Sequence, residues 1–182
     1  GFYNQTEIEQ HIFPKLLSDK NMKHIFYFLW GKAIKRELAL KYQMNLPTSI
    51  IMGEDACCTT PCYLDANLVY MSKKPIYLYT VRGDSITTSF KIIQISQIEE
   101  AVIYLRNLDV KKPVYFEEAL SRYSCFLCFA ILASAAEDGY FGEIKGIKQA
   151  ILGSLHREEI KKAHFENITI KSKIAIYLLN NY

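Results

Sequence analysis

Two acidic residues, Glu54 and Asp55, follow Gly53 where an apolar stretch, residues 49–52, gives way to a helix-like run. A carboxylate in this position can take a proton from a bound hydroxyl, which is the chemistry of a general base. An acidic residue at a helix start is also an ordinary cap for backbone N–H groups that lack an intrahelical partner. The three residues alone leave both interpretations open. Two flanking segments bear on the choice, Trp30-Gly31-Lys32 upstream and the run from Pro75 to Ile86 downstream.

The composition is that of a folded protein without a nucleic-acid-binding surface. The 182 residues are 50% hydrophobic and carry a net charge of +3, enough apolar material for one large domain or two small ones. Basic residues alternate with acidic ones, as in Lys35-Arg36-Glu37, so no one-sided basic patch is expected. The longest apolar run, Cys125 to Ala136, is shorter than the roughly 20 residues needed to cross a bilayer. We therefore expect a cytoplasmic protein, with at most peripheral association with the inner face of the plasma membrane.

The five cysteines are an odd number and lie in apolar, helix-like segments. This pattern is typical of reduced, buried thiols in a cytosolic protein. The spacing of Cys125 and Cys128 also suits a zinc ligand pair, with Cys57 and Cys62 as a second pair. However, the segment lacks the turn-forming residues of a zinc knuckle, so buried thiols are favoured and no metal site is expected within the chain.

Hydrophobic periodicity predicts an α-rich α/β protein. The expected strands are residues 49–52, 68–71 and 75–81, and the expected helices are residues 7–17, 29–42, 54–66, 96–108, 116–137, 141–155, 157–165 and 170–179. Strand-like alternation ends near residue 90. Residues 1–90 are thus expected to form an α/β portion, and residues 91–182 a helical region packed against it.

From Phe28 to Ser89 the chain resembles the C-terminal half of the catalytic domain of family 2 glycosyltransferases, the GT-A type that builds bacterial surface polysaccharides. The matching segments are Trp30-Gly31-Lys32, residues 34–38, Gly53-Glu54-Asp55, residues 66–71, residues 75–79 and residues 82–86. The resemblance implies half of a GT-A nucleotide-diphospho-sugar transferase fold, followed by a helical C-terminal extension.

The resemblance also implies roles for single residues. Asp55 falls on the general base of an inverting transfer from a nucleotide-sugar donor to a hydroxyl of a saccharide acceptor. Glu54 holds an acceptor hydroxyl, anchors a neighbouring side chain, or only adds negative charge to the helix start. Trp30 either stacks on a sugar ring or belongs to the core. Lys32 either reaches the diphosphate or acceptor, or is a solvated surface lysine.

Arg82 and Ser85 are the expected contacts to the pyrophosphate of the donor. The planar guanidinium and the hydroxyl both form directional bonds to phosphate oxygens. The alternative is a surface turn in which Arg82 pairs with Asp84.

The family's Asp-x-Asp motif, which holds a divalent cation on the diphosphate, does not occur in these residues. The Mg²⁺ or Mn²⁺ of the full-length enzyme is therefore expected to have its ligands outside this chain. We expect the chain to be a fragment that is inactive alone, with an open sheet edge through which it could form a homodimer. The alternative function is a non-catalytic helical interaction module that docks a partner protein or membrane surface. In the transferase, Asp55, Trp30 and Arg82 should line one cleft.

Overall fold

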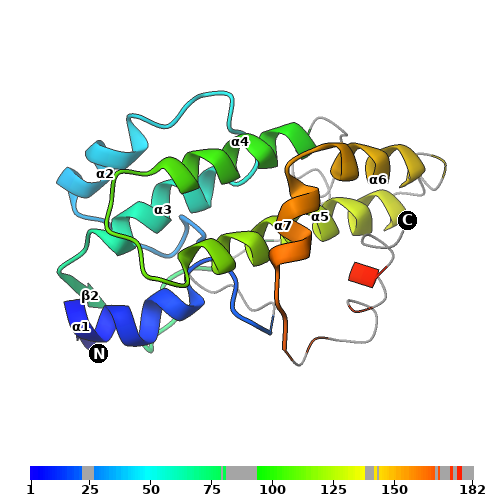
Figure 1. Ribbon diagram of the computed structural model, residues 1–182. Helices are drawn as coiled ribbons and strands as arrows, with labels where there is room; N and C mark the ends of the chain where they lie inside the picture. The colour runs from blue at the N-terminus through cyan, green and yellow to red at the C-terminus, as the bar shows by residue number, and fades with distance from the viewer. Residues whose placement is uncertain are drawn as a thin grey trace.

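Helices dominate the computed structural model, which describes residues 1–21, 27–78, 80, 94–137, 142, 144–166, 168, 173 and 176–177. In chain order they are α1 (Gln5–Glu7), continued by a π-helical turn (Ile8–Ile12) and a 3-10 turn (Phe13–Lys15), then α2 (Arg36–Gln43), α3 (Glu54–Leu64), α4 (Gln94–Asn107), α5 (Phe116–Glu137), α6 (Ile144–Gly153) and α7 (His156–Lys162). Two short strands, β1 (Phe2–Asn4) and β2 (Leu68–Tyr70), complete the described elements. The α-rich class predicted from the sequence is confirmed (Figure 1).

The two strands pair antiparallel, with Phe2 opposite Tyr70. The strand predicted at residues 68–71 is thus confirmed within one residue. The strand predicted at residues 49–52 is wrong, because the backbone N–H of Ile50 donates to the Pro47 carbonyl and closes a turn instead. Residues 75–78 of the third predicted strand form no strand either, and residues 79 and 81 lie outside the described part.

The helix predicted at residues 29–42 is correct only in its second half, since α2 begins at Arg36. Gly31 has a φ of 70°, which a right-handed helix does not allow. The Thr59 side chain in α3 donates a hydrogen bond to the Tyr27 carbonyl, 2.7 Å away, and ties the preceding backbone to that helix. Residues 27–32 therefore form a loop, which we call the aromatic loop. Trp30 and Lys32 lie on this loop rather than on a helix.

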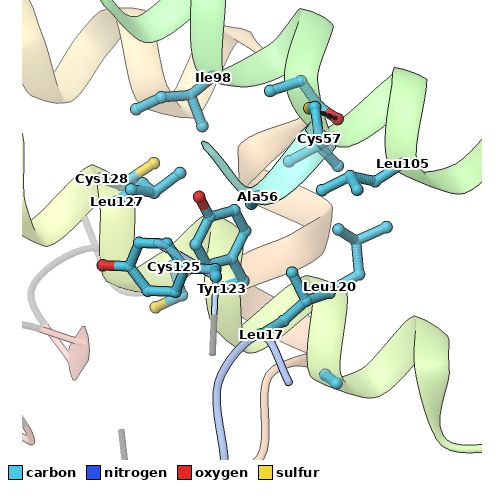
Figure 2. Close-up of a cluster of buried hydrophobic side chains, with 14 of the residues drawn as sticks. Leu17, Ala56, Cys57, Ile98, Leu105, Leu120, Tyr123, Cys125, Leu127 and Cys128 are labelled. Carbon is cyan, nitrogen blue, oxygen red and sulfur yellow. Dashed lines mark hydrogen bonds between the residues drawn. The ribbon is translucent and has the colours of Figure 1, made fainter. Parts of the chain in front are cut away.

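Helix α5 runs through the middle of the apolar core, α4 packs along it, and α3 packs between α2 and α4 with its start near Tyr123 of α5 (Figures 1 and 2). Figure 2 shows the Tyr123 ring of α5 next to Ala56 of α3, with Cys125, Leu127 and Cys128 of α5 in the same cluster. The predicted reduced, buried thiols are confirmed, because all five cysteines are free and buried. No helix in the described residues is both long enough and apolar enough to span a membrane.

Helix α7 crosses α5 and is held there by a buried histidine (Figure 1). The fully buried His156 ring lies 2.7 Å from the Ser124 hydroxyl through Nδ1 and 3.1 Å from the Ile95 carbonyl through Nε2. A carbonyl oxygen only accepts, so Nε2 carries the proton and Nδ1 accepts from Ser124. The histidine therefore links α7 to α5 and α4 in its neutral form.

A second buried polar contact lies one turn further along α7. The carboxylate of Glu159 accepts hydrogen bonds from Ser121 at 2.6 Å and from Arg106 at 2.9 Å. Arg106 also pairs with Glu117. Because Glu159 is nearly fully buried, these partners are needed to satisfy its charge.

The start of α3 is fixed by Gly53, whose φ of 86° is left-handed. A side chain at this position would place its Cβ 3.1 Å from the Cβ of Ala101 in α4 and 3.5 Å from the hydroxyl of Tyr123 in α5. Glycine is thus required here both by its backbone conformation and by the space available. The first turn of α3 lies directly against two helices as a result.

Replacing this glycine should destabilise the fold. We expect Gly53→Ala to lower the free energy of unfolding by about 1–3 kcal/mol, because the backbone is strained and Ala101 must move. Urea denaturation measures the change. Gly146→Ala is the matched control, since Gly146 is exposed in α6 and a Cβ there would meet nothing within 4 Å. That substitution should stabilise by up to about 1 kcal/mol. Equal changes in the free energy of unfolding for the two variants would show that the Gly53 position does not require glycine's conformation or small size.

The buried histidine should make stability depend on pH. Burial lowers the pKa of His156 below its usual 6.5, although the Ile95 carbonyl and the carboxylates of Glu99 and Glu159 act in the opposite direction. As pH falls through 6.5 the unfolded chain takes up a proton that the folded chain does not. Stability should therefore decline from pH 6.5 down to the lowered pKa, as urea midpoints will show. The His156→Gln variant should be less stable at neutral pH but should lose this part of the pH-dependent decline in stability. An unchanged decline in the variant would exclude His156 as its source.

Candidate functional site

Asp55 occupies the first turn of α3 and is half-buried against the aromatic loop. Its carboxylate accepts a hydrogen bond from the backbone N–H of Leu29 and lies within electrostatic range of the Lys32 ammonium. Burial raises the pKa of Asp55, and these two partners counter the rise in part. The helix dipole alone predicts a shift in the other direction. Desolvation outweighs it here because the loop covers one side of the carboxylate.

Glu54 precedes Asp55, and its carboxylate interacts with backbone N–H groups at the same helix start. Its carboxylate accepts hydrogen bonds from the backbone N–H groups of Glu54 and Gly53. Desolvation nevertheless raises the pKa of Glu54, and the neighbouring Asp55 charge adds to the rise. These backbone N–H groups favour the charged form of Glu54, as expected for an acidic residue at a helix start.

Lys32 is the cation beside Asp55. Its ammonium donates a hydrogen bond to the Phe28 carbonyl within the aromatic loop. Burial lowers the pKa of Lys32, whereas the Asp55 carboxylate raises it in part. This half-buried position differs from the solvated surface lysine that was the alternative prediction.

Trp30 stands at the surface of the aromatic loop with 40% of its area exposed. Its ring stacks on Phe28, with ring centres 4.8 Å apart, and on Tyr77, with centres 5.3 Å apart. The exposure excludes a place in the buried core. Trp30 is therefore held in a fixed orientation while part of its ring faces solvent.

Two tyrosine rings pack together at this site, that of Tyr27 in the loop and that of Tyr123 in α5. The Tyr27 ring contacts that of Tyr123, with centres 5.3 Å apart. The Tyr123 hydroxyl is fully buried, points toward the start of α3 (Figure 2), and has no hydrogen-bond partner among the described residues. Burial raises its pKa well above the usual value, so the phenol stays protonated. The site thus rests on an apolar floor with a single buried hydroxyl directed at Gly53.

The structure brings four of the six predicted site residues into one neighbourhood: Trp30, Lys32, Glu54 and Asp55. Arg82 and Ser85 lie outside the described residues. The sequence analysis missed three groups that shape the site, namely the Leu29 backbone, Tyr27 and Thr59. The left-handed preference of Gly31, inside a predicted helix, was the local signal that this stretch forms a loop.

A groove of about 530 Å³ lies elsewhere on the molecule. It is lined by residues around the far end of α3, including Leu64 and Asp65, and by residues 110–115. The 11 residues of α3 separate this end from Asp55 by roughly 15 Å at a rise of about 1.5 Å per residue. The groove is therefore separate from the site of the acidic pair.

The site does not resemble a metal centre. Among the described residues, no group of three or more His, Cys, Asp or Glu side chains could hold a metal ion. The carboxylate next to Asp55, that of Glu54, belongs to an exposed residue. The described residues thus do not fit the divalent cation that the family resemblance implies.

Comparisons of the chain with protein-family models, curated proteins and solved structures found no match. The chemistry of the site therefore follows from its own residues. A half-buried carboxylate with one backbone donor keeps capacity to accept a proton, a neighbouring lysine supplies positive charge, and exposed aromatic rings lie alongside. These features suit a polar, uncharged substrate with an apolar face.

The electrostatic link between Lys32 and Asp55 can be measured directly. We expect Lys32→Met to raise the pKa of Asp55 further, because the nearby positive charge that favours the carboxylate is removed. NMR titration of the Asp55 side-chain carboxyl carbon reads the shift. Lys35→Met is the matched control, since Lys35 is exposed and lies outside the aromatic loop. An identical Asp55 titration in the wild type and the Lys32 variant would show that the two charges do not interact.

Proposed function

We propose that the chain is the acceptor-side part of an inverting family 2 glycosyltransferase with a GT-A fold, and that Asp55 is its general base. The observation that carries this proposal is the position of Asp55, which is held by the Leu29 N–H beside the Lys32 ammonium. The resemblance of residues 28–89 to that family supports it. In a mere helix cap, the carboxylate would bond to N–H groups of its own helix, whereas the backbone group that favours the Asp55 carboxylate is that of Leu29 in the aromatic loop.

The proposed reaction needs a proton acceptor at the acceptor sugar. As the acceptor hydroxyl oxygen attacks the anomeric carbon, its O–H proton passes to the Asp55 carboxylate. A new C–O bond forms on one face, and the bond to the nucleoside diphosphate breaks on the other and leaves its electron pair with the diphosphate. Attack from the opposite face inverts the anomeric configuration.

The raised pKa of Asp55 serves this role. A carboxylate of higher pKa is a stronger base once it is deprotonated, and the optimal catalytic pKa lies near the working pH. Lys32 keeps the carboxylate ionised before the substrate binds and can hydrogen-bond an acceptor hydroxyl after leaving the Phe28 carbonyl. Transfer should accordingly decline as pH falls through the raised pKa of Asp55.

The donor side of the reaction lies with other residues. We place the nucleotide-sugar site, with its Asp-x-Asp motif and divalent cation, outside these 182 residues, and Arg82 and Ser85 at the pyrophosphate. The chain alone is then inactive. The product is a saccharide of a bacterial surface polysaccharide, made in the cytoplasm or at the inner face of the plasma membrane.

The proposal predicts that Asp55→Asn abolishes sugar transfer in the longer enzyme that contains this chain, while circular dichroism shows an unchanged fold. The amide has nearly the same shape but cannot accept the proton. Release of nucleoside diphosphate in the presence of acceptor measures transfer.

The matched control is Asp65→Asn at the other end of α3. The Asp65 carboxylate accepts hydrogen bonds from Lys41 at 2.8 Å and Tyr42 at 2.9 Å, far from the proposed reaction. Transfer should survive this change. Transfer that survives Asp55→Asn equally well would remove Asp55 from the role of base and favour the helical interaction module.

A further inference from the structure

Three aromatic side chains form a continuous stack beside Asp55. Phe28 and Trp30 are inclined by 25° to each other, and Trp30 and Tyr77 by 20°. Trp30 thus contacts both other rings. The stack runs in the order Phe28, Trp30, Tyr77.

This order decides which ring can receive a ligand. Trp30 already contacts two rings and is 40% exposed. Tyr77 ends the stack, is 52% exposed, and has Trp30 as its only ring contact among the described residues. Its outer face is the open aromatic surface of this site.

Tyr77 is also connected to the acidic pair through the aromatic loop. The Cβ of Tyr77 lies 3.6 Å from the position that a Cβ on Gly31 would take. The next residue along the chain is Lys32, which lies within electrostatic range of Asp55. The open ring therefore flanks the same loop as the proposed base.

On the basis of the proposed function, we infer that Tyr77 is the ring on which the acceptor saccharide stacks, and that Trp30 is its support. The ligand class is a pyranose that presents a face of C–H groups. Those C–H groups carry partial positive charge and are attracted to the negative face of the phenol ring. The contact also removes apolar surface of the sugar and of the ring from water. The sugar hydroxyls at the ring edge then remain available to Lys32 and Asp55.

The chain contains a built-in reporter for this contact. Trp30 is the one tryptophan of the sequence and lies directly behind Tyr77, so its fluorescence responds to a ligand on that ring. We would titrate the 182-residue chain with cellobiose, lactose and maltose. Sorbitol serves as the control because it has similar hydroxyls but no ring face. At least one disaccharide should give a saturable change in fluorescence that sorbitol does not give.

Substitutions at Tyr77 identify the ring. Tyr77→Phe keeps the stacking face and should bind the same disaccharide with similar affinity. Tyr77→Leu keeps an apolar side chain without the ring and should weaken binding by roughly tenfold. Saturation-transfer NMR provides a second measurement that does not depend on the altered surroundings of Trp30. Tyr70→Leu is the matched control, since Tyr70 is 62% exposed in β2 and contacts the Phe2 ring at an angle of 49°.

The outcomes separate this inference from the proposed function. Equal binding by the wild type and Tyr77→Leu, or no saturable binding of any of the three disaccharides, would overturn Tyr77 as the acceptor platform. Neither result touches the role of Asp55. Asp55→Asn should retain disaccharide binding in this chain within a few fold while it loses transfer in the longer enzyme. Retained transfer would refute the base even if Tyr77 binds sugar.

Discussion

The site depends on the close approach of α3 to α4 and α5 at Gly53. A residue without a Cβ, in a left-handed conformation, lets the helix begin against Ala101 and Tyr123 without displacing either. The position of the first turn of α3 is therefore fixed by contacts with two long helices rather than by a surface loop. Thr59, on the same helix, holds the Tyr27 carbonyl and thereby carries the aromatic loop to that turn. The carboxylate of Asp55 and its loop neighbours are thus positioned by one packing contact.

Three carboxylates lie in α3 or directly after it, those of Glu54, Asp55 and Asp65, and their surroundings differ. Glu54 is turned onto backbone N–H groups, and Asp65 is bound by Lys41 and Tyr42, which together hold the pKa of Asp65 below its usual value. Asp55 has one backbone donor and a lysine at longer range, and burial raises its pKa. Among the three, Asp55 combines spare acceptor capacity with partial desolvation. This combination, rather than the acidic residue type, distinguishes a possible base from a cap.

Some of this arrangement could be predicted from the sequence. Helix α5 has the predicted bounds, Phe116–Glu137, because its apolar residues run without a Gly or Pro, and α3 begins at the predicted Glu54. The aromatic loop could not be predicted, since its shape depends on a hydrogen bond to Thr59, 32 residues later, and on packing against Tyr123. Local helical periodicity in residues 29–35 is overridden by these contacts. The expected strand at residues 49–52 is replaced by a local turn, in which the Ile50 N–H donates to the Pro47 carbonyl ahead of Gly53.

The five buried cysteines have a consequence for how the molecule opens. Burial raises the pKa of Cys58 and Cys62 to about 11 and that of Cys125 to about 12, so the native protein presents almost no thiolate at neutral pH. Alkylating reagents attack the thiolate, and they reach these buried sulfurs only when the core around α3 and α5 opens. The rate of thiol modification therefore records the opening of the core that supports Asp55. Because the thiols lie on two helices, the order in which they react distinguishes local fraying of α3 from loss of the whole fold.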